Sequence, residues 1–284
     1  MEANRQALPL SLMCQIMDVS RSGFYAWRQR PASVRLQQDQ SLSELVHKAH
    51  AAGRQVYGSP RVQEQLRQWG VRACRHRIAR LMRNARLQGR SNHLFVRKAP
   101  FLKFFHQVPN RILDLQVTGP NQVWHGDVTY LKVNGAWRYL AVIIDRFSRR
   151  VVGWSLAHHR TSKLTIAALQ HAMRNRKPAK GLHFHSDRGI EFSSLEFKAK
   201  LRQHGFVQSM NRASHINDNA YIESFFHSLK IEGLFKMTFD QDQKLWDEVI
   251  SYIQFYNQHR LHSSIGYMPP AAFELRHLTH AAVH

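Results

Sequence analysis

The second half of the chain is built from segments with two different hydrophobic periods. A period of two predicts a strand with one buried face, and a period near 3.6 predicts an amphipathic helix. From residue 121 onward the pattern predicts strands at 123–132, 138–144 and 150–156, a helix at 161–175, a strand at 182–185, a helix at 194–204, a strand at 206–210 and a helix after residue 218.

This order of elements is typical of an RNase H-like fold, an α/β class in which a mixed sheet carries helices on both faces. We place this domain at residues 121–240. A further amphipathic helix at 242–256 and a short helix that begins at Pro269-Pro270 follow it. They predict a helical extension of the core over residues 241–284.

The first 87 residues have only helical patterns. Short helices are expected within 7–30 and one helix at 40–52. Ser59 is the predicted cap of the next helix, with Val62, Leu66 and Trp69 on its apolar side, and Gly70 ends it. A second helix follows from Cys74, and two helices joined by a glycine-containing turn predict a helix-turn-helix.

The second of these helices is rich in arginine. Its apolar residues face inward, which leaves Arg75, Arg77, Arg80 and Arg83 facing solvent. A DNA-contacting surface and an ordinary solvated face both account for this pattern. Residues 88–120 form the predicted linker to the core, whose cations can follow phosphates and whose aromatics can dock on the core or stack on bases.

The net charge favours nucleic acid as the partner. The 284 residues include 41 Lys and Arg against 19 Asp and Glu, and residues 1–111 hold 20 of the basic but only 5 of the acidic residues. An excess of Lys and Arg favours binding to a phosphate backbone, because the binding releases counterions from the nucleic acid. The two cysteines exclude a disulfide framework and a Cys/His zinc domain. No segment approaches the ~20 apolar residues of a membrane span, so a cytoplasmic protein is expected.

Asp127 is the first candidate for chemistry. It lies in a run of strand-forming residues, where aspartate is locally unfavourable. Alternation would put His125, Asp127 and Thr129 on one face, away from the apolar side that carries Trp124 and Val128.

Asp187 and Glu223 complete the acidic set. Asp187 follows the strand at 182–185, and Glu223 borders the apolar stripe of the helix after 218, with Lys230 two turns further along that face. Carboxylates that converge from two strand ends and a helix suit hard divalent cations, Mg²⁺ or Mn²⁺. Two such ions ~4 Å apart can clamp the attacking and leaving oxygens of a phosphoryl displacement.

The spacing of these acids belongs to a wider pattern. The residues between Asp187 and Glu223 number 35. Together with the blocks at 124–130, 145–154, 185–189, 218–226, 229–230 and 256–267, the chain resembles the frame-B transposases of the insertion-sequence-three family, which have the aspartate-aspartate-(35)-glutamate core of the retroviral-integrase superfamily.

The resemblance implies metal-dependent DNA cleavage that exposes a 3′-hydroxyl, followed by direct attack of this hydroxyl on another phosphodiester. It assigns Asp127, Asp187 and Glu223 as catalytic metal ligands, and Lys230 as a contact to the DNA backbone. It implies double-stranded DNA as partner, a homo-oligomer on that DNA, and the product of an upstream reading frame as a second partner. It also implies a bacterial, nucleoid-associated location in the cytoplasm.

Other polar residues near these motifs have structural explanations. Asp218 is a rival third ligand, but a cap for the following helix accounts for it. Asp145 stands at a hairpin end, where aspartate commonly serves the turn. His125 and His185 either touch phosphate or are hydrogen-bonded structural residues.

Two alternative functions fit parts of this pattern. A retroviral-type integrase needs a His/His/Cys/Cys zinc domain, which Cys14 and Cys74 cannot supply. A non-enzymatic DNA-binding protein that retains the fold as scaffold or regulator is the other alternative, and the intact acids argue against it.

Overall fold

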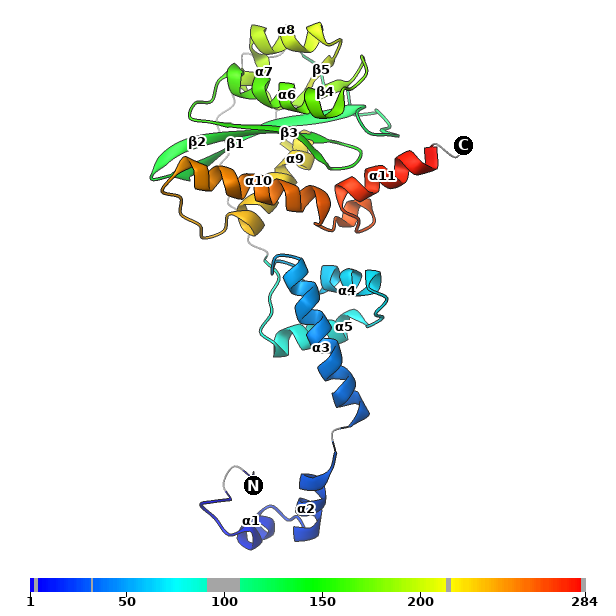
Figure 1. Cartoon of the computed structure of the whole chain (residues 1–284), viewed down its shortest axis with the longest axis vertical. Coiled ribbons are helices and arrows are strands. Elements are labelled where there is room, and N and C mark those ends of the chain that lie inside the picture. Colours follow the sequence, from blue (N-terminus) through cyan, green and yellow to red (C-terminus); the bar gives the residue numbers. More distant parts are fainter. Residues whose placement is uncertain (3–4, 32, 91–107, 213–215, 282–284) are drawn as a thin grey trace.

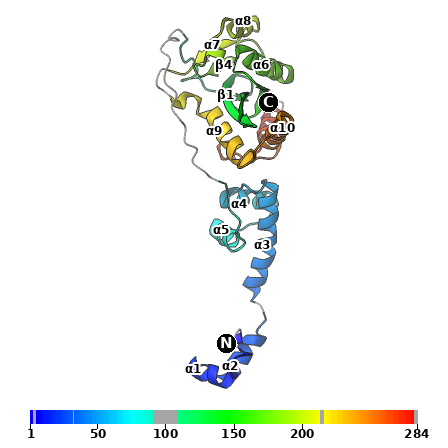
Figure 2. The ribbon, with the colours of Figure 1, turned by 90° about the vertical axis from the view of Figure 1, so that its left-hand side faces the viewer.

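The computed structural model describes residues 1–2, 5–31, 33–90, 108–212 and 216–281. Figures 1 and 2 show a pair of short helices at the N-terminus, then a helical module, and then an α/β core. The first pair is α1 (Leu10–Ile16) and α2 (Arg21–Gln29). These two helices lie apart from the core in both views.

The core is organised around one five-stranded sheet in the order β3-β2-β1-β4-β5. Its strands are β1 (Val123–Val133), β2 (Ala136–Asp145), β3 (Val151–Ala157), β4 (His183–Ser186) and β5 (Val207–Met210). β1, β2 and β3 pair antiparallel, whereas β4 pairs in parallel with both β1 and β5. The sheet is therefore mixed, as predicted.

Helices cover both faces of this sheet (Figure 1). One side carries α6 (Ser162–Arg176), α7 (Ile190–Ser193) and α8 (Leu195–Gln203), and the other carries α9 (Ala220–Ser228) and α10 (Asp242–Gln258). Alternate residues of β2 point to opposite faces of the sheet. Ala141 and Ile143 pack in the hydrophobic core under α6, α7 and α8, and Leu140 and Val142 pack in the core under α9 and α10. The predicted RNase H-like fold class is confirmed.

The helical module contains α3 (Val34–Ala52), α4 (Ser59–Gln68) and α5 (Arg75–Asn84). Two details of the prediction are wrong. Gly58, not Ser59, is the N-cap of α4, and no side chain caps it. Trp69 is 43% exposed because it lies at the C-cap, beyond the apolar face of α4.

Tyr57 fastens this module to the core. Its side chain is fully buried, and its hydroxyl donates to the carbonyl of His259 at 3.3 Å and accepts from Leu261 N–H at 3.0 Å. Arg54 adds a hydrogen bond of 2.6 Å to Ser251 Oγ. A buried polar group that makes both of its bonds across a junction fixes the two parts in register.

The predicted linker at 88–120 lies partly outside the described residues, which leave out 91–107. Its second part runs along the core: Arg111 N–H donates to Ser209 Oγ at 2.8 Å, Met210 N–H donates to Pro109 O at 3.3 Å, and Ile112 is buried. This stretch docks on the core, one of the two roles predicted for the linker.

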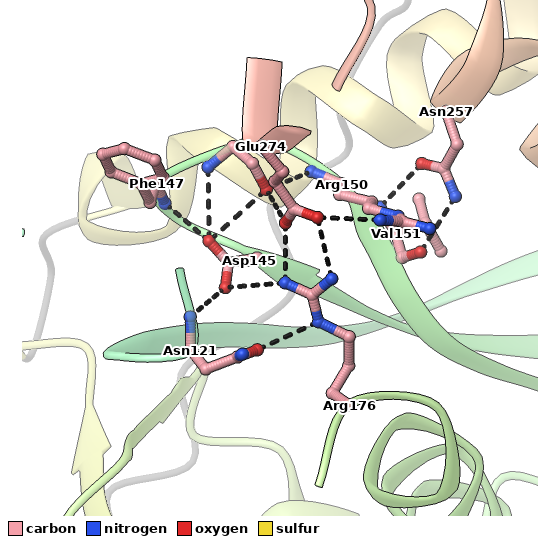
Figure 3. Close-up of polar contacts among 9 residues, drawn as sticks. Asn121, Asp145, Phe147, Arg150, Val151, Arg176, Asn257 and Glu274 are labelled. Atoms are coloured by element: carbon pink, nitrogen blue, oxygen red, sulfur yellow. Dashed lines mark hydrogen bonds and ion pairs between the residues drawn. The ribbon is translucent and has the colours of Figure 1, made fainter. Parts of the chain in front are cut away.

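Asp145, the acid assigned to a turn, has that role. It is fully buried at the end of β2, and its Oδ1 accepts the N–H groups of Phe147 and Ser148 at 2.9 and 3.2 Å. Its Oδ2 accepts the Asn121 N–H at 2.6 Å (Figure 3). Burial raises the pKa of Asp145, and these donors oppose that shift.

The last helix, α11 (Pro270–Ala281), is attached through Glu274 (Figure 3). This carboxylate is 3% exposed and accepts from Ser148 Oγ at 2.6 Å, Arg150 at 2.8 Å and both terminal nitrogens of Arg176 at 2.6 and 2.7 Å. Burial raises its pKa, but the arginines outweigh burial and hold the pKa below its usual value. Within the described ranges, no helix is long and apolar enough to cross a membrane.

We expect Glu274→Gln to lower the free energy of unfolding by about 3 kcal/mol, since it leaves two arginines partly buried without their carboxylate. Chemical denaturation at pH 7 measures this loss. Because the folded-state pKa of Glu274 is depressed, its contribution is present above pH ~4.3 and declines as the pH falls further. The difference between wild type and variant should therefore shrink in acid.

Glu44→Gln is the matched control, because Glu44 is exposed on α3. It should change stability by less than about 0.5 kcal/mol. Equal effects of the two substitutions would show that the Glu274 cluster contributes nothing specific.

Candidate active site

Asp127 and Asp187 are brought together by the register of two parallel strands. The last registered pair between β1 and β4 is Gly126 with Ser186, so the next residue of each strand is an aspartate. Asp187 follows the end of β4, as predicted. Asp127 does not lie at a strand end: β1 continues to Val133, paired there with β2 alone. Asp127 is therefore the first residue of β1 beyond its pairing with β4.

The side of β1 that carries His125, Asp127 and Thr129 is covered by a helix. His125 is fully buried and Thr129 is 6% exposed, because α9 packs over this side of β1. His125 Nδ1 donates to Asn219 Oδ1 at 2.8 Å, and Asn219 is the N-cap residue of α9. This bond ties the start of the Glu223 helix to the strand that carries Asp127.

A second histidine braces the neighbouring strand. His185 pairs in register with His125, and their rings lie 5.1 Å apart. Its Nδ1 accepts from Ser209 Oγ at 2.9 Å, and its Nε2 donates to Asn211 Oδ1 at 2.8 Å. Burial lowers the pKa of His125 to about 3 and that of His185 to about 4, so both are neutral at pH 7. They are hydrogen-bonded structural histidines two residues before each aspartate.

The three predicted acids interact electrostatically. Burial raises the pKa of Asp127, and the charges of Asp187 and Glu223 raise it further. The pKa of Glu223 is raised by burial and then by Asp187, and that of Asp187 is raised by burial and then by Glu191. Negative charge therefore accumulates at the end of β4, at a cost that a bound cation relieves.

The donor chemistry fits a hard divalent cation. Asp127 Oδ1 accepts the Val128 N–H at 2.7 Å and Asp187 Oδ1 accepts the Gly189 N–H at 3.0 Å, which leaves the second oxygen of each without a donor among the described residues. All three acids offer oxygen, as Mg²⁺ and Mn²⁺ prefer. Across the described ranges, no three Asp, Glu, His or Cys side chains are already gathered into a ligand set.

Lys230 lies near the same acids. It belongs to the π-helical turn Leu229–Gly233 that continues α9, and its Nζ is 4.9 Å from the centre of the Tyr130 ring. Burial lowers its pKa, and the charge of Asp127 opposes this shift. The π turn changes the helical phase, yet Lys230 still lies within electrostatic range of the Asp127 carboxylate.

A fourth acid was missed by the sequence analysis. Glu191 on α7 is 2% exposed, and its Oε1 accepts from Arg160 Nε and Nη2 at 2.9 and 2.7 Å. Its Oε2 is buried and has no hydrogen-bond partner in the described part of the chain. Arg160 also interacts electrostatically with Asp127 and Asp187. The sequence signal that could have identified Glu191 is its position four residues after Asp187.

The prediction that Asp218 caps the next helix is wrong. It lies in the 3₁₀ turn Ile216–Asn219, and its carboxylate accepts from Asn110 at 2.9 Å and from Arg212 N–H and Nη2 at 2.9 Å each. Hydrogen bonding to Arg212 holds its pKa far below the usual range. A carboxylate with these donors has a structural role that needs no metal.

The arginines of α5 do not all face solvent as predicted. Arg75 and Arg83 are exposed, whereas Arg77 Nε and Arg80 Nη2 bind the two oxygens of Asp39 on α3 at 2.6 and 2.5 Å. These ion pairs fasten α5 to α3. Arg75 and Arg83 therefore have the more accessible guanidinium groups.

Comparison with known proteins follows the same division of the chain. The Integrase core domain family matches residues 117–215 and again 204–270, and the HTH-like domain family matches residues 37–93. Transposase InsF for insertion sequence IS3A of Escherichia coli K12 is 36% identical over 98% of both chains. A 31 kDa protein of insertion element IS600 from Shigella sonnei is 36% identical over 95% of this chain and 100% of its own.

Two solved structures with a similar fold come from retroviruses. The HTLV-2 integrase catalytic core domain in complex with magnesium is 23% identical, with a TM-score of 0.43 over 55% of this chain and 98% of its own. A chain of the simian T-cell lymphotropic virus intasome is 19% identical, with a TM-score of 0.49 over 75% of this chain and 70% of its own.

We expect Asp127→Asn to raise the free energy of unfolding of the metal-free protein by about 1 kcal/mol, because it removes one of the repelling charges. Millimolar Mg²⁺ should raise the melting temperature of the wild type and have a smaller effect on the variant. Differential scanning fluorimetry with and without Mg²⁺ measures both.

The control is Asp114→Asn, an exposed aspartate outside the site. It should respond to Mg²⁺ as the wild type does. If Mg²⁺ stabilised Asp127→Asn as strongly as the wild type, Asp127 would not be a ligand.

Proposed function

The chain belongs to the IS3 family of transposases, and we propose that it carries out metal-dependent DNA cleavage and strand transfer at the ends of an insertion sequence. The observation that carries this proposal is the register of β1 and β4, which sets Asp127 beside Asp187, together with the packing of the Glu223 helix α9 against β1. The mutual effect of the three acids on their pKa values supports a common site.

In the proposed reaction, a water oxygen bonds to phosphorus and the bond to the 3′ oxygen breaks, which leaves a 3′-hydroxyl. This hydroxyl then attacks a second phosphodiester, and one strand replaces another without a covalent protein intermediate. A pair of divalent ions, when bound, supplies the charge that activates the nucleophile and stabilises the leaving oxygen. Asp127, Asp187 and Glu223 would hold these ions.

The surrounding residues would orient these groups and the DNA. Lys230 offers a cation beside Asp127, suited to a phosphate of the bound strand. The neutral histidines fix the two strands, and Asn219 fixes α9. Arg160 holds Glu191 and offsets part of the acidic charge before DNA arrives.

The proposal extends to the organisation of the chain. Residues 1–87 would bind DNA, 88–120 would link to the core, 121–240 would catalyse and 241–284 would support the core. The basic N-terminal part and the HTH-like match support double-stranded DNA as partner. Family membership supports a homo-oligomer on DNA and an upstream-frame product as second partner.

The residue roles can be separated by measuring chemistry and DNA affinity independently. Glu223→Gln, Asp127→Asn and Asp187→Asn should abolish cleavage and strand transfer while DNA affinity holds or rises. Lys230→Ala should weaken binding and lower the slope of log affinity against log salt by about 1, with residual chemistry at high DNA concentration. Gel-based cleavage with Mg²⁺ and binding by fluorescence anisotropy give the two readouts.

Asp218→Asn is the control for the third ligand. It keeps hydrogen-bond acceptance but loses the ion pair with Arg212, so we expect lower stability with the cleavage rate of folded protein retained. An active Glu223→Gln beside a folded but inactive Asp218→Asn would assign the third ligand to Asp218 instead.

The arginine-rich helix gives a separate test of DNA binding. Arg75→Ala with Arg83→Ala should weaken duplex binding and lower the salt slope by up to about 2, because their side chains are free to reach phosphates. Arg77→Ala with Arg80→Ala should mainly lower the melting temperature, since they hold Asp39. If the first pair left affinity and salt dependence unchanged, α5 would be an ordinary solvated helix.

A further inference from the structure

A strongly basic cavity lies where the helical module meets the core. Its volume is about 840 Å³, and its lining includes four arginines, Arg61, Arg90, Arg149 and Arg260, but only one carboxylate, Glu232. This size is within the range of ~300–1,000 Å³ that ligand pockets occupy. A surplus of positive charge in a partly enclosed space favours an anion.

Glu232 neutralises only one side of this cavity. Its oxygens bind Arg260 Nε and Nη2 at 2.7 Å each, and Arg61 Nη1 lies 3.5 Å from one of them. Arg90 and Arg149 form no ion pair with any acid that the structure describes. No carboxylate among the described residues therefore competes with an anionic ligand for these two guanidinium groups.

Each of the four guanidinium groups lies near an aromatic ring. Arg149 Cζ is 3.8 Å from the centre of the Tyr221 ring, and Arg90 Cζ is 5.7 Å from that of Phe235. Arg61 and Arg260 lie 5.7 and 5.6 Å from the rings of Tyr57 and Tyr256. A cation held near a ring is restrained in position, and its N–H groups remain available for a phosphate.

The cavity connects the active-site helix with the helix-turn-helix. Ser224 and His227 line it, and they lie one residue and one turn beyond Glu223 on α9. Gly58 and Ser59 line its opposite side, where α4 begins without a side-chain cap. The positive end of that helix dipole adds to the charge of the arginines.

We propose that this cavity binds a backbone phosphate of the DNA strand that passes from the helical module to Glu223. Arg90 and Arg149 are its principal contacts, and Arg61 and Arg260 support the field. The site fixes the distance along the DNA between the segment held by the module and the phosphodiester at the acids. The inference rests on the proposed function, because it takes the DNA as the substrate of those acids.

The test compares full-length wild type with Arg90→Gln/Arg149→Gln, using a duplex that carries the terminal sequence of the insertion element. The double variant should bind roughly tenfold or more weakly at a fixed salt concentration. Its salt slope should fall by about 1, because one phosphate contact is lost. Arg90→Lys/Arg149→Lys keeps the charges and should retain most of the slope, and melting curves establish that each variant is folded.

Arg54→Gln is the matched control. Arg54 crosses the same junction, near the ring of Phe255 at 5.2 Å, but does not line the cavity. It should leave the salt slope unchanged. Equal slopes for wild type and the folded double glutamine variant, or equal losses for that variant and Arg54→Gln, would overturn the cavity assignment.

Neutral methylphosphonates placed one at a time along the duplex identify the phosphate. One position should weaken wild-type binding and have little effect on the double glutamine variant, and the lack of any such position would also overturn the proposal.

Cleavage by the wild type is measured separately. A wild type that cleaves DNA while the arginine variants bind normally contradicts only the cavity. A wild type that never cleaves contradicts the proposed function. The salt slope and the methylphosphonate results still test whether the cavity binds a phosphate.

Discussion

The parallel register of β1 and β4 is the constraint on which the site depends. It sets His125 beside His185 and, two residues later, Asp127 beside Asp187. Gly126 between them permits the close packing, since a Cβ there would lie 2.5 Å from the Phe184 ring. A slip of β4 by one residue would turn Asp187 to the other face of the sheet, away from Asp127. The buried histidines oppose such a slip, because each needs hydrogen-bond partners that only this register provides.

Local pattern was sufficient to predict most of the fold but not the surroundings of individual residues. The periods of two and 3.6 identified all five strands and the long helices, because these signals arise within a segment. Burial of His125 depends on α9, almost a hundred residues further along the chain, and so does not appear in the alternation of β1. Arg77 was expected in solvent for the same reason, since its partner Asp39 lies on another helix.

The acids of the candidate site were predictable because their spacing follows a family motif, whereas their neighbours were not. Glu191 has no periodic signal, and its importance comes from burial against Arg160. Asp218 precedes a helix and so matched a capping pattern, but Arg212 and Asn110 compete for its oxygens. An ion pair formed in three dimensions outweighs a cap that sequence position alone suggests.

The distribution of charge links stability to the proposed reaction. Acids that repel one another destabilise the fold locally, and rigid contacts elsewhere must compensate: Tyr57 at the junction, and Glu274 between the sheet and the last helix. Basic groups lie around these acids: Lys230 and Arg160 interact with them electrostatically. Arg149 and Arg260 line the cavity that Ser224 and His227 of the Glu223 helix also line. A polyanion is attracted to the rim, while the acids at the centre repel it unless cations bind there. In the proposed reaction, such an arrangement would couple DNA binding to metal binding, because each would reduce the electrostatic cost of the other.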